Sequence, residues 1–184
     1  MADTQLTQYF VAASMDGFIA TEDDDLSWLL QFEGADVDQD ANPYDAFISD
    51  VGALAMGATT YEWILAHDEG PWAYGDRPTW VFTHRELPSV EGAVLRFTQD
   101  DVTNLHPQML AEAGGRNVWI VGGGELAGQF LDAGLLDEIW LTVTPVTLGQ
   151  GAPLLPRRHT TPMTLVSAVP APNGTFVHLR YRLR

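Results

Sequence analysis

The chain contains no cysteine and no lysine. Without cysteine it can form no disulfide, no thiolate nucleophile and no zinc–thiolate site, and its five histidines show no metal-ligand spacing, so we expect no metal. A membrane-spanning helix requires about 20 consecutive apolar residues, and no such run is present. The first residues lack the basic region that opens a secretory signal. These absences predict a cytoplasmic protein with no membrane partner.

Positive charge is also scarce, because 9 arginines stand against 25 acidic residues and the formal net charge is −16. Residues 1–76 hold 16 of the acids and no arginine, whereas residues 77–184 hold 9 acids and all 9 arginines. A chain of this charge, with no basic run, lacks the electrostatic footprint of a nucleic-acid-binding protein. The 46% of apolar residues indicate a folded core. We expect one domain over residues 1–184.

Short apolar runs alternate with amphipathic segments along the chain. Strands are expected at residues 8–14, 53–56, 78–83, 94–97, 117–121 and 138–144, and helices at 43–48, after 59, at 102–113 and at 125–133. Two further strands, 163–169 and 175–183, flank a Pro-Asn-Gly turn, and alternation in the second predicts a solvated polar face. This order predicts an α/β fold with a mixed, mostly parallel sheet and an antiparallel C-terminal hairpin.

The most prominent motif is a run of three glycines, Gly122, Gly123 and Gly124, between a predicted strand and a predicted helix. Glycine permits close backbone approaches, and a helix N-terminus presents unpaired N–H groups that favour an anion such as a diphosphate. A tight turn in which Glu125 complements the helix dipole explains the motif equally well. Because the glycines are consecutive, this is not the spaced dinucleotide-binding fingerprint.

Two further segments offer groups for phosphate or ribose. Gly57 separates a predicted strand from a predicted helix whose first residues include Thr59 and Thr60, although in isolation an ordinary capping box is the simpler interpretation. Residues 83–85 (Thr-His-Arg) end another predicted strand and could bind a phosphate monoester, with the arginine bidentate. Taken alone, a polar turn is the simpler explanation of this segment.

The candidate catalytic groups are two carboxylates. Asp16 lies in a turn directly after the first predicted strand. Glu33 follows Trp28 by five residues, where a short helical stretch could hold it in a pocket with its pKa raised. The neighbouring acids Asp36, Asp38 and Asp40 are interpreted as a solvated loop.

Taken in order, residues 11–20 (VAASMDGFIA), 56–62 (MGATTYE) and 121–126 (VGGGEL) resemble the dihydrofolate reductase-like superfamily. Residues 134–141 (GLLDEIWL) and 145–154 (PVTLGQGAPL) resemble the reductase domain of the bifunctional riboflavin-biosynthesis deaminase/reductase and its stand-alone relatives. The likeness runs from residue 8 to the C-terminal hairpin. It implies a three-layer fold whose central mixed sheet, of about eight strands, binds NADPH across its carboxyl edge.

The resemblance also implies roles for individual residues. The glycines 122–124 would approach the nicotinamide and diphosphate, Gly57, Thr59 and Thr60 the diphosphate and ribose, and residues 83–85 the 2′-phosphate. Ile19 and Ala20 would offer backbone groups to the carboxamide, Asp16 would lie near the substrate, and Glu33 falls roughly where dihydrofolate reductases carry their pocket carboxylate. The cofactor site implied is completed by the following residues: Ala13, Thr83, His84, Arg85, Val121, Glu125 and Leu126.

One position departs from the family pattern. Many members carry Arg after the glycine of the second motif, where this chain has Ala58. One charge-assisted hydrogen bond to phosphate is worth about 1.5–3 kcal/mol, or roughly ten- to a hundredfold in Kd. The second glycine turn therefore has to bind phosphate through backbone N–H groups and hydroxyls.

These features predict an NAD(P)H-dependent reductase, related to the pyrimidine reductase of riboflavin synthesis, that transfers a hydride to a small polar substrate. A true dihydrofolate reductase is one alternative, but the first 76 residues supply no Arg to hold a glutamate tail. A non-catalytic dimeric nucleotide-binding domain is the other, supported by Ala58. The apolar alternation of the C-terminal hairpin further predicts a homodimer.

Overall fold

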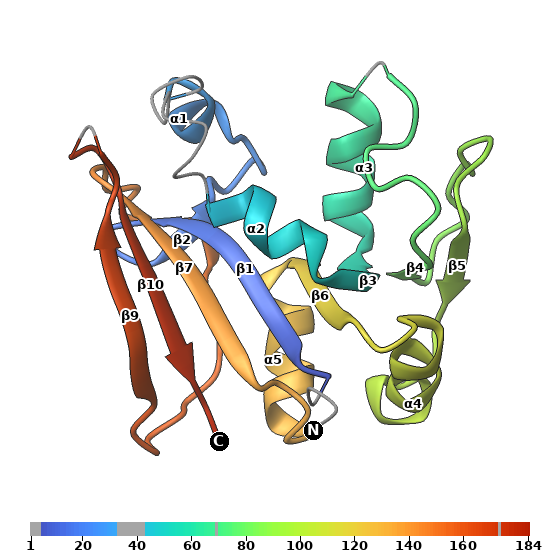
Figure 1. Cartoon of the computed structure of the whole chain (residues 1–184). Coiled ribbons are helices and arrows are strands. Elements are labelled where there is room, and N and C mark those ends of the chain that lie inside the picture. Colours follow the sequence, from blue (N-terminus) through green and yellow to red (C-terminus); the bar gives the residue numbers. More distant parts are fainter. Residues whose placement is uncertain (1–4, 33–42, 69, 173) are drawn as a thin grey trace.

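An eight-stranded mixed sheet forms the centre of the computed structural model, which describes residues 5–32, 43–68, 70–172 and 174–184 (Figure 1). Its strands are β1 (Thr7–Ser14), β3 (Val51–Gly57), β4 (Thr79–Phe82), β5 (Leu95–Thr98), β6 (Asn117–Gly122), β7 (Glu138–Thr144), β9 (Thr164–Pro170) and β10 (Val177–Arg182). They lie in the order β5-β4-β3-β6-β1-β7-β10-β9, and only the pairings of β10 with β7 and β9 are antiparallel. The predicted fold class is confirmed.

Helices cover both faces of this sheet. They are α1 (Ser27–Leu30), α2 (Pro43–Ser49), α3 (Ala58–His67), α4 (Val102–Glu112) and α5 (Gly124–Asp132). A small second sheet pairs β2 (Phe18–Ala20) with β8 (Ala152–Pro153). Among the described residues, no helix is both long enough and apolar enough to cross a membrane.

Two hydrophobic clusters, one on each face, hold the three layers together. Strand β3 is buried on both sides, so Ala53 and Ala55 pack with α4 and α5, while Leu54 and Met56 pack with α2 and α3. Strands buried on both faces carry continuous apolar runs, as expected of a parallel sheet between helices. The helix-covered strands β3 and β6 therefore form a rigid base from which the following turns project.

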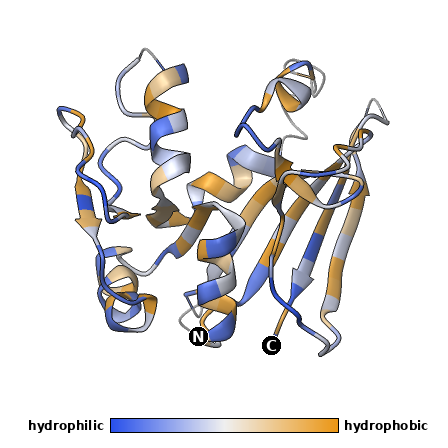
Figure 2. Ribbon diagram, turned by 180° about the vertical axis from the view of Figure 1, so that it is seen from behind, coloured by the Kyte–Doolittle hydropathy of each residue, from blue (hydrophilic) through white to orange (hydrophobic). Residues whose placement is uncertain are grey.

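The C-terminal hairpin differs from the expectation of one cleanly solvated face. Arg180 and Arg182 of β10 both bind Glu138 of β7, at 2.9 Å each, and the Glu138 side chain is fully buried. On the edge strand β9, by contrast, Leu165, Val166 and Val169 remain 41–54% exposed. Figure 2 shows hydrophobic residues along this edge of the sheet. The polar face is thus partly buried and the apolar edge partly exposed.

Candidate functional site

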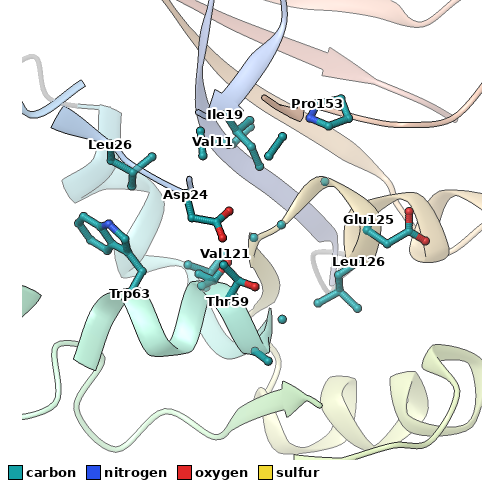
Figure 3. Close-up of a pocket in the computed structure, with 18 of the residues that line it drawn as sticks. Val11, Ile19, Asp24, Leu26, Thr59, Trp63, Val121, Glu125, Leu126 and Pro153 are labelled. Atoms are coloured by element: carbon teal, nitrogen blue, oxygen red, sulfur yellow. The ribbon is translucent and has the colours of Figure 1, made fainter. Parts of the chain in front are cut away.

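A cleft of about 760 Å³ opens over the carboxyl ends of β3, β4 and β6 (Figure 3). Its floor includes the last residues of these strands, Gly57, Phe82 and Gly122. The small β2–β8 sheet contributes a second wall through Ile19 and Pro153. In open α/β sheets ligands bind at this edge, because the turns that follow parallel strands meet there.

Two helix N-termini meet in the cleft. Strands β3 and β6 are neighbours, with Met56 opposite Gly122, and α3 and α5 begin directly after them. The N-caps are Gly57 and Gly123, and neither helix has a side-chain cap hydrogen bond. The capping box considered for the α3 start is therefore wrong, because the helix begins at Ala58, before either threonine. Both helices turn uncapped N–H groups and the positive end of their dipoles toward the cleft, which favours a bound anion.

The glycines at these junctions serve two different purposes. A Cβ on Gly124 would lie 2.2 Å from the Pro153 carbonyl oxygen, so the fold itself requires this glycine, and a Cβ on Gly122 would lie 2.9 Å from Thr60 Oγ1 and would displace the Thr60 side chain. A Cβ on Gly57 or Gly123 would meet nothing closer than 3.9 Å. The fold therefore has room for a side chain at Gly57 and at Gly123. Because glycine has no side chain, this room stays open space in the cleft.

The structure brings most of the predicted cofactor residues together. Those that line the cleft are Ile19, Ala20, Gly57, Thr59, Thr60, Val121, Gly122, Gly123, Gly124, Glu125 and Leu126. Ala13 is buried within β1 and does not line it. Three motifs that are far apart in sequence thus share one cavity, while their role in cofactor binding stays a prediction.

The Thr-His-Arg segment follows β4 and is not among the residues that line the cleft. Thr83 Oγ1 accepts a hydrogen bond from the Arg85 N–H at 2.9 Å, which closes the turn. The Arg85 guanidinium pairs with Glu62 of α3 at 2.7 Å, and both side chains are more than a third exposed. His84 is exposed. Arg85 is therefore held beside α3, and its role toward a 2′-phosphate stays a prediction.

Asp16 lies outside the cleft lining and is exposed. Its carboxylate accepts hydrogen bonds from Ser14 Oγ at 2.6 Å and from the N–H groups of Leu148 and Gly149 at 3.1 and 2.7 Å. The Ser14 hydrogen bond, aided by the two N–H groups, lowers the pKa of Asp16. An ionised Asp16 ties the turn after β1 to the loop after β7. Glu33, the other predicted catalytic carboxylate, lies outside the described residues.

Several residues that line the cleft were not predicted from the sequence. Trp63 of α3 lies four residues after Thr59, so the shared helical face could have revealed it. Asp24 enters the cleft from the loop after β2 with a φ of 57°, in the left-handed region (Figure 3). Nothing in the acidic run around it distinguishes Asp24 from its neighbours. Leu26 and Leu29 complete this end of the cleft.

Comparison with known structures supports the fold. A structure described as a putative riboflavin biosynthesis protein from Shewanella sp. PV-4 aligns with a TM-score of 0.75 at 23% identity, over 98% of this chain and 100% of that one. Dihydrofolate reductase from Enterococcus faecalis, complexed with NADP(H), aligns with a TM-score of 0.62 at 19% identity, over 97% of each chain. At such identities the likeness shows the dihydrofolate reductase-like fold.

Comparison of sequences shows the family. The uncharacterized protein YwjB of Bacillus subtilis (strain 168) is 34% identical over 148 residues, which are 80% of this chain and 81% of that protein. The model of the RibD C-terminal domain matches residues 64–177, from the middle of α3 to the start of β10. The matched region contains the triple-glycine turn and the helix that follows it. The chain belongs to the RibD C-terminal domain family.

Proposed function

We propose that the protein is an NADPH-dependent reductase of the riboflavin-biosynthesis type, which reduces a C=N or carbonyl group of a small polar substrate. The observation that carries this proposal is the convergence of two uncapped helix N-termini, those of α3 and α5, on one cleft at the carboxyl edge of the sheet. Membership of the RibD C-terminal domain family supports reductase chemistry. The NADP(H) complex of the structurally similar dihydrofolate reductase supports a nicotinamide cofactor.

The residues present suit this cofactor. The N–H groups at the starts of α3 and α5, with the hydroxyls of Thr59 and Thr60, offer donors to a diphosphate without any cation. The open space at Gly57 and Gly123 lets a ligand approach the backbone closely. When bound, NADPH supplies a hydride from its nicotinamide ring to an electron-poor carbon of the substrate.

The chain's own residues position the reactants and limit water. Ile19, Phe82, Leu126 and Pro153 give the cleft apolar walls, which strengthen polar contacts inside it. Reduction also requires one proton on the substrate nitrogen or oxygen. Because its hydrogen bonds lower the pKa of Asp16, that carboxyl stays ionised near neutral pH and is a poor proton donor. Glu33, which lies outside the described residues, and water therefore remain as the candidate proton donors.

Titration of the purified protein with NADPH, followed by nicotinamide fluorescence, tests the first step. We expect saturable binding with a stoichiometry of one per chain. Absence of saturation at millimolar NADPH would refute the proposed function. Turnover is then tested by loss of nicotinamide absorbance with candidate pyrimidine and pterin substrates.

We also propose that the protein is a homodimer built on the edge strand β9. Leu165, Val166 and Val169 expose apolar surface on a strand whose outer edge is unpaired within the described sheet. Such an edge invites pairing with another chain, and a second copy brings the same apolar surface to the contact. Light scattering at micromolar concentration should give twice the chain mass, and Val169→Glu should give the monomer mass. A monomer in the unmodified protein would contradict the proposal.

A further inference from the structure

The two ends of the cleft differ in chemistry. Figure 3 shows Glu125, Leu126 and Pro153 at one end and Trp63 and Leu26 at the other, with Asp24 between the two groups, above Thr59 and Val121. The first end includes the start of α5, one of the two helix N-termini that suit a diphosphate. The second end is walled by aromatic and aliphatic side chains, which extend over the sheet to Phe10 and Trp119. This second end is the part available to a substrate.

Charge beside the second end of the cleft is negative. None of the nine arginines is among the described residues that line the cleft, and residues 1–76 contain no Arg or Lys in sequence. The two acidic lining residues differ in their surroundings. Glu125 is paired with Arg157 at 2.6 Å, whereas the carboxylate of Asp24 receives no ion pair or hydrogen bond from the described residues. Among the described residues that line the cleft, Asp24 therefore provides the unpaired negative charge near a bound substrate.

The loop after β2 holds Asp24 in place. The Thr21 carbonyl accepts a hydrogen bond from the Asp24 N–H at 3.1 Å, and Thr21 Oγ1 accepts one from the Asp25 N–H at 3.0 Å. The next carboxylate, Asp25, accepts a hydrogen bond from the Ser27 N–H at 3.2 Å at the start of α1. The left-handed backbone of Asp24, which non-glycine residues seldom adopt, fits this closed turn. Asp24 is therefore directed into the cleft by the backbone, while the Asp25 carboxylate binds Ser27, the first residue of α1.

We propose, on the basis of the reductase function above, that the substrate is a flat nitrogen heterocycle that is neutral or cationic and carries no phosphate or carboxylate, and that Asp24 is the specificity-determining residue that accepts its N–H groups. Aromatic and aliphatic walls suit a flat ring. An amino or protonated ring nitrogen forms a charge-assisted hydrogen bond with a carboxylate. A phosphate or carboxylate at this end meets Asp24 without a compensating cation, so like charges oppose its binding.

Matched ligand pairs test this specificity in the NADP⁺-saturated protein. The probes are 5-amino-6-ribosylaminouracil with its 5′-phosphate, which differ in the phosphate alone, and dihydrobiopterin with dihydrofolate, whose aminobenzoylglutamate tail adds two carboxylates. Calorimetry gives the Kd of each. We expect the uncharged member of at least one pair to bind about tenfold or more tightly than its anionic partner, the effect of one charged hydrogen-bond partner. Equal or tighter binding of the anionic member in both pairs, or no binding by any of the four probes, overturns the proposal.

Two variants assign the effect to one carboxylate. Asp24→Asn should weaken binding of the preferred probe about tenfold and reduce the preference within its pair. Asp23→Asn removes the same charge from a neighbour that is exposed, as Asp24 is, but does not line the cleft, and should change neither. Equal effects of the two substitutions would overturn the role of Asp24. NADPH titration of the unmodified protein separates the two proposals, because a failure there refutes the reductase function, whereas normal NADPH binding without probe preference refutes only the substrate class.

Discussion

Replacing Gly57 by alanine separates what the fold requires from what the cofactor requires. Gly57 is the N-cap of α3, with φ −79° and ψ 166°, a conformation that alanine adopts without strain. Its Cβ would lie 3.9 Å from the Gly122 oxygen and the Gly123 nitrogen, an ordinary contact distance. Alanine is a poorer N-cap than glycine, but it restricts the unfolded chain, which stabilises by about 0.4–1 kcal/mol. We expect a net change in unfolding free energy below about 1 kcal/mol.

The same methyl group should impair NADPH binding. It would occupy open space beside the first N–H groups of α3, where we propose that the diphosphate binds. Loss of one charge-assisted hydrogen bond costs about 1.5–3 kcal/mol, which is roughly a ten- to hundredfold rise in Kd. Nicotinamide fluorescence gives the Kd, and urea unfolding gives the stability of the same preparation.

Gly52→Ala is the reciprocal control. A Cβ at Gly52, which lies at the opposite end of β3 from the cleft, would be 2.0 Å from the Ala113 carbonyl oxygen. This overlap should lower the unfolding free energy by about 1–3 kcal/mol or more, while the folded protein keeps its Kd for NADPH. Unchanged NADPH affinity in Gly57→Ala would refute the assignment of the diphosphate. A loss of stability as large as that of Gly52→Ala would instead refute the inference that the fold has room for a side chain at Gly57.

Three further predictions concern charged groups. Arg85→Ala should weaken NADPH binding about tenfold and NADH binding much less, and equal losses in the two titrations would place the 2′-phosphate elsewhere. Asp16→Asn should lower the free energy of unfolding at pH 7, as measured with urea. This difference from the unmodified protein should vanish as the pH falls through the lowered pKa of Asp16. A difference that persists in acid would rule out this linkage. Glu138→Ala should lower the free energy of unfolding by about 2–3 kcal/mol in the same assay. This is less than the loss of a fully buried ion pair, because Arg180 and Arg182 are partly exposed. A decrease below about 0.5 kcal/mol would contradict the expectation.

The effect of pH on Glu138 has a defined sign. Burial raises its pKa, but hydrogen bonds from Gln8, Arg182 and Arg180 together outweigh burial and hold the pKa below its usual range. A carboxyl whose pKa is lowered by folding stabilises the protein above its unfolded pKa, and this stability is lost as the pH falls through the folded value. Glu138 and Asp16 therefore both contribute to unfolding in acid.

The main sheet was predictable because its strands are buried between helices. Continuous apolar runs such as those of β3 and β6 reflect burial on both faces, and each is followed by glycine and a helix start. The short strands β2 and β8 were not predicted, and α1 was considered only as a short helical stretch after Trp28. They span 3, 2 and 4 residues, too few to show a periodicity. The β2–β8 pairing joins segments more than 130 residues apart, so only the tertiary fold specifies it.

The candidate site was predictable in its motifs but not in all its residues. The two glycine turns could be identified locally, whereas their meeting depends on the adjacency of β3 and β6 in the sheet. The contacts of Asp16, whose catalytic role stays a prediction, could not be predicted because its hydrogen-bond donors Leu148 and Gly149 are 132 and 133 residues away. Asp24 lies among other acids, and only the backbone of its loop turns it toward the cleft. Local patterns therefore identify the turns, and long-range contacts decide what their side chains do.

A crystal structure of the protein with NADP⁺ tests the central claim most directly, because the claim assigns one ligand to two separate helix N-termini. The account predicts the diphosphate between the starts of α3 and α5, within hydrogen-bond distance of their first N–H groups and beside Gly57 and Gly123. A diphosphate bound away from these helix starts, or an empty cleft at saturating NADP⁺, would contradict it.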